Sequence, residues 1–251
     1  MFGRDNFEGK VALVTGASGN LGVAIVEKLL SLGCRIFATY QSNRVALEKV
    51  LAEHPQKNLL TVRRCDITNA DEVSSLLSFV AGEVKKLDIL VNSAGIYKDN
   101  LFLQMTLEEF DQVIKANLYG VFNVTKSSLP LLRAAKVASV VNISSVAGLV
   151  GSFGQANYSA AKAAIGGLTR TLASELTSKG IRVNAIAPGL IDSDMVKRIP
   201  RNVVRQALTV IPAQRLGTVA EVANVVAFLA SGESSYIVGQ TIAVDGGLVL
   251  R

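Results

Sequence analysis

The stretch from residue 10 to residue 22 limits the possible folds of this chain more than any other. It begins with the short apolar run Lys10-Val11-Ala12-Leu13-Val14, which is typical of a buried strand in a parallel sheet. The glycine-rich run Thr15-Gly16-Ala17-Ser18-Gly19-Asn20-Leu21-Gly22 follows, and then an amphipathic helix to about Leu32. Backbone amides and the positive end of a helix N-terminus attract phosphate at such a turn. The sequence therefore predicts a phosphate-binding strand, turn and helix.

Strand and helix patterns alternate through the rest of the chain. Further strands are expected at 35–40, 59–64, 87–91, 139–143, 181–187 and 241–244. Helices are expected at 45–52, from a Thr68 cap to about 84, at 107–132, up to the Lys179-Gly180 stop, and at 219–230. This alternation predicts an α/β fold: one doubly wound Rossmann domain over 1–251, with a seven-stranded parallel sheet and helices on both faces. Residues 190–215 mix charged and apolar residues with two prolines, which suggests a mobile helical flap beside the strand ends.

Composition excludes several classes of protein. No apolar run approaches the roughly 20 residues that span a bilayer, and the first residues lack a signal pattern, so we expect a soluble cytoplasmic protein without a membrane partner. The net charge of +6 is scattered, which argues against nucleic-acid binding. Cys34 and Cys65 are isolated in apolar runs and are expected to be buried free thiols. With His54 as the only histidine, no metal site is expected.

Tyr158 and Lys162 are the first candidates for chemistry. In a helix, positions i and i+4 share one face, so the phenol and the ammonium point the same way. A nearby cation favours the ionised phenol and lowers its pKa from about 10, which would allow proton exchange at neutral pH. Such a pair also arises by chance, so its weight depends on its neighbours. Ser144 and Ser145 follow the predicted strand at 139–143, and Asn117 is a poor mid-helix residue that indicates a local distortion or a hydrogen-bonding task.

The residues after the second strand bear on the choice of dinucleotide. An acid at this strand's end would bind a ribose 2′-hydroxyl, but the segment Tyr40-Gln41-Ser42-Asn43-Arg44 has none and carries a base. This favours NADPH over NADH. Arg44 fits equally well as a solvated residue that opens the next helix. Small residues at Asn92-Ser93-Ala94-Gly95 would let a ligand lie against the backbone at another strand end.

Taken in order, these elements resemble the short-chain dehydrogenase/reductase family over nearly the whole chain, and within it are most similar to 3-oxoacyl-[acyl-carrier-protein] reductases. The resemblance rests on Thr15–Gly22, Asp66, Asn92–Gly95, Asn117, Ser145, Tyr158, Lys162 and Pro188-Gly189. The chain departs from the family in three places. Asn20 stands where glycine is usual, although asparagine tolerates a left-handed φ well. Gly19 stands where NADP-binding members often have a base, and Ser93 replaces the second asparagine of Asn-Asn-Ala-Gly.

The resemblance implies roles for individual residues. Ser145 and Tyr158 would bind a ketone oxygen, Tyr158 would donate the proton, Lys162 would lower its pKa and hold the nicotinamide ribose, and Asn117 would position a water that returns the proton. The implied contacts to NADPH (or, less favoured, NADH) are Gly16, Ser18, Gly19, Asn20, Leu21, Gly22, Tyr40, Ser42, Arg44, Asp66, Ile67, Asn92, Ala94, Gly95, Tyr158, Lys162, Pro188, Gly189, Ile191 and Ser193.

The implied activity is NADPH-dependent reduction of a 3-oxoacyl thioester on acyl carrier protein, in fatty-acid or polyketide-type synthesis. The alternatives are the same chemistry on another ketone or alcohol (acetoacetyl-CoA, a steroid, a sugar or a small diketone) and a nucleotide-binding scaffold, since fold alone does not give function. The resemblance also implies a homotetramer and places carrier docking near the cleft at Lys136 and Lys179. Each of these lysines fits equally well as a helix-end residue that interacts with the dipole.

Overall fold

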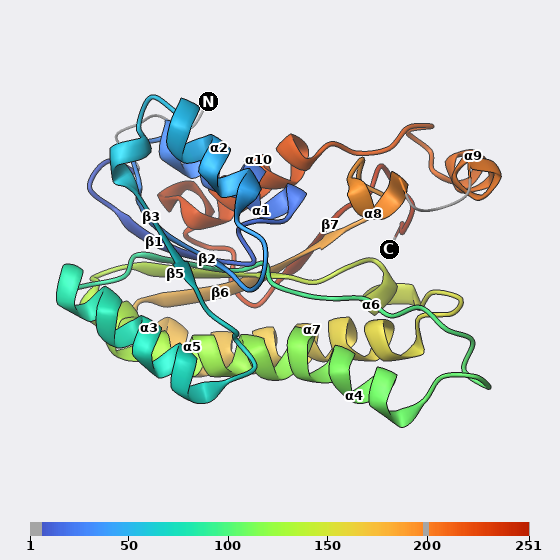
Figure 1. Cartoon of the computed structure of the whole chain (residues 1–251), viewed down its shortest axis with the longest axis horizontal. Coiled ribbons are helices and arrows are strands. Elements are labelled where there is room, and N and C mark those ends of the chain that lie inside the picture. Colours follow the sequence, from blue (N-terminus) through green and yellow to red (C-terminus); the bar gives the residue numbers. More distant parts are fainter. Residues whose placement is uncertain (1–6, 198–200, 251) are drawn as a thin grey trace.

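Seven parallel strands form the centre of the computed structural model, which describes residues 7–197 and 201–250 (Figure 1). They are β1 (Val11–Thr15), β2 (Arg35–Tyr40), β3 (Leu60–Arg64), β4 (Ile89–Asn92), β5 (Ala138–Ile143), β6 (Ile181–Pro188) and β7 (Thr241–Val244). Their order is β3-β2-β1-β4-β5-β6-β7. Every residue of β1, β4, β5 and β6 is buried, which explains why these strands are mainly apolar in the sequence. The predicted doubly wound fold is confirmed.

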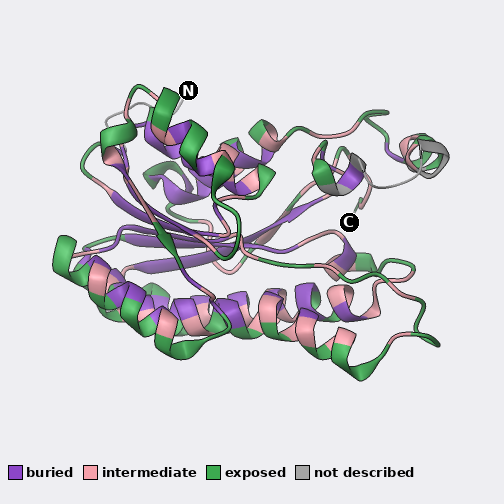
Figure 2. Cartoon of the chain, viewed as in Figure 1, coloured by how far each residue is buried: buried purple, intermediate pink, exposed green. Residues whose placement is uncertain are grey.

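Helices cover both faces of the sheet (Figure 1). One face carries α1 (Asn20–Ser31), α2 (Val45–Glu53) and α10 (Val219–Ala230), and the other α3 (Ala70–Glu83), α5 (Gly120–Ala134) and α7 (Ala156–Leu176). The remaining helices are α4 (Leu107–Ile114), α6 (Ala147–Val150), α8 (Asp194–Lys197) and α9 (Arg201–Val210), with short 3-10 turns at Lys57–Leu59, Thr177–Lys179 and Gly232–Ser234. Each long helix buries the stripe that faces the sheet (Figure 2). No helix in the described ranges is long and apolar enough to cross a membrane.

Two predicted helix boundaries differ from the structure. Asn69, and not Thr68, caps α3, because its Oδ1 accepts from the backbone N–H groups of Asp71 at 2.9 Å and Glu72 at 3.2 Å. The single helix expected at 107–132 is interrupted by a π-helical turn, η3 (Lys115–Tyr119), between α4 and α5. The predicted Gly180 stop is confirmed, since Gly180 follows the last turn at φ 78°.

Candidate active site

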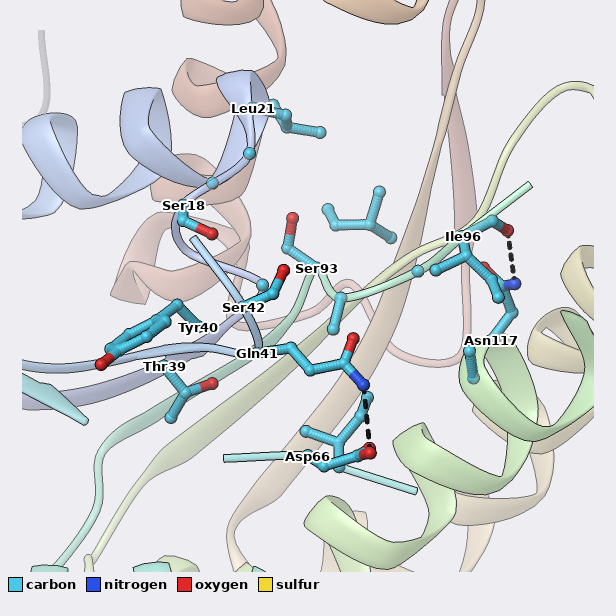
Figure 3. Close-up of a pocket in the computed structure, with 18 of the residues that line it drawn as sticks. Ser18, Leu21, Thr39, Tyr40, Gln41, Ser42, Asp66, Ser93, Ile96 and Asn117 are labelled. Carbon is cyan, nitrogen blue, oxygen red and sulfur yellow. Dashed lines mark hydrogen bonds between the residues drawn. The ribbon is translucent and has the colours of Figure 1, made fainter. Parts of the chain in front are cut away.

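A cavity of about 430 Å³ opens at the carboxyl ends of β1, β2 and β4. The order of the strands reverses between β1 and β4, which is where doubly wound sheets bind ligands. Sixteen of the predicted site residues line it: Gly16, Ser18, Gly19, Asn20, Leu21, Gly22, Tyr40, Ser42, Asp66, Ile67, Ala94, Gly95, Asn117, Tyr158, Lys162 and Ser193. Figure 3 shows Ser18 and Leu21 of the first turn at one side of this cavity and Asn117 at the other.

The glycine-rich turn is shaped for close backbone approach. Gly16 has φ 62°, and a Cβ there would overlap the backbone of Ala94. A Cβ on Gly22 would overlap the carbonyl oxygen of Gly16. No side chain caps the first amides of α1, so they remain available to an anion in the cavity. The turn therefore fits the pyrophosphate of a dinucleotide.

Asn20 needs no special backbone conformation. It begins α1, and among described residues Gln214 is the only non-glycine with a positive φ. A left-handed φ is thus not the reason that asparagine is tolerated at this position. Its Oδ1 instead accepts from the backbone N–H of Asp194, the first residue of α8, at 3.5 Å.

The end of β2 supplies uncharged polar groups to the cavity. Gln41 donates from Nε2 to Oδ2 of Asp66 at 3.0 Å (Figure 3), and Thr68 donates from Oγ1 to Oδ1 of the same carboxylate at 2.8 Å. Burial opposes the charge on Asp66, but these hydrogen bonds hold its pKa below the ordinary value. The sequence reasoning missed several lining residues, of which Gln41 could have been found from its place directly after β2. They are Thr39, Gln41, Asn43, Cys65, Thr68, Ser93, Ile96, Ala116 and Ile143.

The structure does not bring Arg44 into this cavity. Its Nε lies 2.7 Å from Oε1 of Glu48, one turn along α2, and both side chains are exposed. Arg44 and Glu48 line a separate hollow with Leu51 and Leu60. An i,i+4 ion pair on the first turn of a helix accounts for this placement, so the structure agrees with the solvated alternative for Arg44.

Other predicted cofactor contacts lie outside the cavity wall and stabilise the strand ends. Asn92 is buried and donates from Nδ2 to Thr125 Oγ1 at 3.0 Å and to Asn142 Oδ1 at 2.8 Å, which ties β4 to α5 and β5. Gly189 packs against Asp245, which leaves no space for a side chain. Pro188 ends β6, and Ile191 is buried and forms an isolated bridge with Gly217.

Ser145 and Tyr158 come together from two elements. Ser145 follows β5 and Tyr158 lies in the first turn of α7, and the Ser145 hydroxyl lies close enough to the phenol to favour its ionised form. Ser145 Oγ also accepts from the backbone N–H of Ala147 at 3.2 Å, which fixes the hydroxyl at the start of α6. Two hydroxyl donors therefore converge at the edge of the cavity, where they can bind one oxygen atom.

The lowering of the Tyr158 pKa that was expected from Lys162 is not the largest influence on this phenol. Burial raises the pKa of Tyr158 above its ordinary value, against the opposing effect of the Ser145 hydrogen bond. The Lys162 ammonium is buried, and its Nζ donates to the carbonyl oxygen of Ile143 at 2.8 Å while lying 5.6 Å from the Tyr158 ring centre. Burial lowers the pKa of Lys162 to about 8. Burial is therefore the largest influence on both pKa values.

Asn117 lies in the π-helical turn η3, which is a local distortion of the kind that the sequence indicated. Its Nδ2 donates to the carbonyl oxygens of Ile96 at 2.7 Å (Figure 3) and Val113 at 2.9 Å, whereas its buried Oδ1 has no partner. A Cβ on Gly95 would overlap that Oδ1 and lie 3.4 Å from Lys162 Nζ, so both atoms border the same space. An unpaired buried oxygen beside an ammonium suits a bound water or hydroxyl. Turns of this type are frequent at functional sites.

Gly95→Ala is therefore expected to lower kcat by about a hundredfold, because the added methyl displaces the Asn117 amide from its place beside Lys162. Steady-state kinetics would measure the loss. Gly82→Ala is the matched control, since a Cβ at that position in α3 meets no atom within 4 Å. Equal activity of the two variants would contradict the role given to this space.

Lys136 and Lys179 lie next to one another but not beside the cavity. Gly180 packs against the carbonyl oxygen of Lys136, and both lysines are exposed just before β5 and β6 begin. The hydroxyls of Ser145 and Tyr158 and the cavity lie at the carboxyl ends of the strands, at the opposite edge of the sheet. This placement contradicts a docking point beside the cleft of the same chain.

The two cysteines match expectation, since both are buried and free, and burial raises the pKa of Cys34 to about 12 and of Cys65 to about 11.

Comparisons with known proteins identify the family of the chain. A family model described as enoyl-(acyl carrier protein) reductase matches residues 16–249. The chain is 43% identical over 242 residues to the 3-oxoacyl-[acyl-carrier-protein] reductase FabG of Staphylococcus aureus strain Mu50, covering 96% of this chain and 98% of the relative. It is 40% identical over 247 residues to the enzyme of the same name from Escherichia coli K12, covering 98% and 99%.

A solved structure is similar over its whole length. The short-chain dehydrogenase/reductase "Glucose/ribitol dehydrogenase" of Brucella melitensis superposes with a TM-score of 0.93 at 32% identity, covering 98% of this chain and 99% of that one. The match extends from the glycine-rich turn to the last strand, and so includes every element that carries the site. The chain therefore belongs to the short-chain dehydrogenase/reductase family, whose members are oxidoreductases that act on ketone and hydroxyl groups with a nicotinamide cofactor.

Proposed function

We propose that this chain reduces 3-oxoacyl thioesters carried on acyl carrier protein to 3-hydroxyacyl thioesters, with NADPH as the reductant, in fatty-acid or polyketide-type synthesis. The observation that carries the proposal is the Ser145–Tyr158 hydroxyl pair beside a cavity that also holds the buried Lys162 and Asn117. The names of the relatives from S. aureus and E. coli support the choice of substrate.

The residues have distinct tasks in this reaction. The glycine-rich turn and the start of α1 would hold the cofactor's phosphates, and when bound the cofactor supplies the hydride that reduces the carbonyl carbon. Ser145 Oγ and Tyr158 Oη donate hydrogen bonds to the ketone oxygen, and Tyr158 gives up its proton as negative charge grows there. The raised pKa of Tyr158 keeps the phenol protonated at neutral pH, which suits an acid in the reductive direction.

Proton return to Tyr158 needs a path from solvent. The Lys162 ammonium is the nearest charged donor to the ring, and the unpaired Oδ1 of Asn117 borders the same space. A water held there would accept from the Lys162 ammonium and donate to Asn117. After Lys162 passes a proton towards Tyr158, this water would turn to donate a proton to the neutral amine and would be reprotonated from solvent.

The hydroxyl pair favours a ketone over a carbon–carbon double bond, although the family model is described by enoyl reduction. A ketone oxygen has two lone pairs and accepts from both hydroxyls at once. Reduction of an enoyl thioester also builds negative charge on a carbonyl oxygen, but its proton goes to a carbon atom, so a hydroxyl placed to protonate the bound oxygen suits the ketone. Two convergent donors therefore fit the 3-oxo group.

Oxidation of NADPH with acetoacetyl thioester, compared with a panel of other carbonyl compounds, tests the proposal. The Brucella structure makes polyols the second candidate, so the panel includes ribitol and glucose with NADP⁺ and NAD⁺, besides a steroid ketone and a small diketone. We expect the thioester to give the highest kcat/KM by at least about tenfold. A polyol that surpassed it would replace the proposed substrate. A nucleotide-binding scaffold would turn over none of them.

The preference for NADPH rests on the absence of an acid after β2. Tyr40, Gln41 and Ser42 line the cavity there, and none carries a charge that repels a 2′-phosphate. Ser42→Asp is expected to weaken NADPH binding by about tenfold and to leave NADH binding within about twofold, because the new carboxylate opposes only the phosphate. Titration of intrinsic fluorescence measures both dissociation constants, with Ser42→Asn as the uncharged control. Equal losses for the two dinucleotides would contradict the assignment.

We also propose a homotetramer that works in the cytoplasm. The exposed apolar side chains of Leu107 on α4, Tyr119 on the π-helical turn η3 and Phe122 on α5 offer material for an interface. The buried free thiols of Cys34 and Cys65 are consistent with a reducing compartment. Light scattering of the purified protein would measure the assembly, and a monomer at micromolar concentration would contradict it.

A further inference from the structure

Residues 146–157, here called the rim segment, connect the two residues that carry the reacting hydroxyls. The segment begins directly after Ser145 and ends directly before Tyr158, and the Ser145 hydroxyl lies close enough to the Tyr158 phenol to affect its pKa. Its first part is α6, where Gly148 packs against the backbone of Lys162. The rest of the segment is a loop that leads to α7. A group that reacts between the two hydroxyls therefore has the rim segment as its neighbour.

The loop of the rim segment exposes a phenylalanine. Phe153 is 92% exposed, and Val150, five residues after Ser145, is 59% exposed. Phe153 lies between Gly151 at φ 80° and Gly154 at φ 74°, two left-handed positions that favour glycine. A large aromatic ring held in solvent between two such turns has no role in the core. It is available to contact a ligand.

Hydrogen bonds hold this loop in place. The backbone N–H of Asn100 donates to the carbonyl oxygen of Gly154 at 2.9 Å, and Gln155 donates from Nε2 to Oδ1 of Asp99 at 2.9 Å. Asn157, buried in α7, donates from Nδ2 to the carbonyl oxygen of Lys98 at 3.0 Å. Phe153 is thus attached to a fixed wall and not to a free loop.

That wall continues into the cavity. The segment of chain that anchors the rim segment starts at Gly95 and Ile96, which line the cavity. Figure 3 shows Ile96 beside Asn117. Figure 1 shows the rim segment around α6 and the segment before α4 extending beyond the same end of the sheet. A chain attached to a carbonyl held at Ser145 and Tyr158 can leave the site along this wall.

We propose that Phe153, together with Val150, contacts the acyl chain of the substrate beyond its fourth carbon, and that Phe153 sets the preference for chain length. The inference rests on the proposed function. An alkyl chain gains from covering an exposed aromatic ring, whereas a polyol or other polar substrate gains nothing there. A four-carbon substrate is too short to benefit, so the contribution of Phe153 must grow with chain length.

The test compares kcat/KM for acetoacetyl-CoA and 3-oxooctanoyl-CoA in four proteins: the wild type, Phe153→Ala, Phe153→Leu and Tyr236→Ala. We expect Phe153→Ala to lower kcat/KM for the eight-carbon thioester by about tenfold and to leave the four-carbon thioester within about twofold, because only the longer chain loses an apolar contact. Phe153→Leu should stay close to the wild type, since leucine keeps an apolar surface.

Tyr236→Ala is the matched control. Tyr236 is also a fully exposed aromatic residue, but it follows the turn whose Ser234 binds Arg182 near the start of β6, at the opposite edge of the sheet from the hydroxyls. It should change neither rate.

Three outcomes would overturn the inference. Equal loss with both thioesters, or no loss in Phe153→Ala, would remove the chain-length role while the proposed function stands. A change in assembly mass with an unaltered ratio of the two rates would place Phe153 in an interface between copies of the chain. No turnover of either thioester by the wild type would overturn the proposed function itself, and the inference with it.

Discussion

Tyr158→Phe is expected to lower kcat for ketone reduction by about a thousandfold, which corresponds to roughly 4 kcal/mol of lost transition-state stabilisation. The substitution removes the proton donor and one of the two hydroxyls that bind the developing oxyanion, but keeps the ring. Binding of NADPH should stay within about twofold, because the glycine-rich turn and Lys162 are unchanged. Stopped-flow oxidation of NADPH and a fluorescence titration measure the two quantities separately.

A graded control supports that interpretation. Ser145→Ala should cost less, about a hundredfold, because it removes a hydrogen-bond donor and leaves the proton donor in place. Its reduction rate should keep the pH dependence of the wild type, whereas the residual rate of Tyr158→Phe should have lost the alkaline fall caused by the phenol. Wild-type turnover in Tyr158→Phe would refute the assignment of the acid.

The second large effect concerns Lys162, whose buried charge is expected to lower the stability of the fold although the reaction needs it. Its pKa of about 8, against 10.5 for a free lysine, means that burial of the charge costs about 3 kcal/mol at neutral pH. Lys162→Met removes this cost and loses the hydrogen bond to Ile143, worth about 1 kcal/mol. We therefore expect the free energy of unfolding of the variant to be about 2 kcal/mol higher than that of the wild type at pH 7. Its kcat should be about a thousandfold lower.

The sign of this effect with pH is a further check. Between pH 8 and 10.5 the unfolded chain still holds the Lys162 proton that the folded chain has released. The contribution of this group to the free energy of unfolding therefore rises with pH across that window. Urea unfolding at pH 7 and pH 10 should show the advantage of Lys162→Met shrinking as pH rises. A variant that is less stable than the wild type at pH 7 would contradict the account of the buried charge.

Much of the fold follows from the sequence because the central strands are buried on both faces. Residues 11–15 and 138–143 are mainly apolar for that reason, and their positions were predicted to within one residue. The helix at 219–230 was also predicted with its observed bounds, since Thr218 and Glu221 form a capping box at its start. The start of α3 was misplaced by one residue, because Thr68 and Asn69 adjoin and both are residue types that cap helices.

The site shows what a sequence pattern leaves open. The spacing placed Tyr158 and Lys162 on one helical face. It could not show that Lys162 Nζ donates to the Ile143 carbonyl, or that burial is the largest influence on both pKa values. Arg44 was close to the cavity along the chain, yet the ion pair with Glu48 directs it elsewhere. Side-chain partners of this kind depend on distances between elements, which a single sequence does not contain.

The central claim is that the chain reduces the 3-oxo group of an acyl thioester. Parallel assays of acetoacetyl and crotonyl thioesters on acyl carrier protein, with NADPH oxidation followed by mass analysis of the acyl products, test it most directly. The account predicts rapid formation of the 3-hydroxybutyryl thioester with one NADPH consumed per product, and at least about a hundredfold slower conversion of the crotonyl thioester. Faster reduction of the crotonyl thioester to the saturated butyryl product would contradict the account.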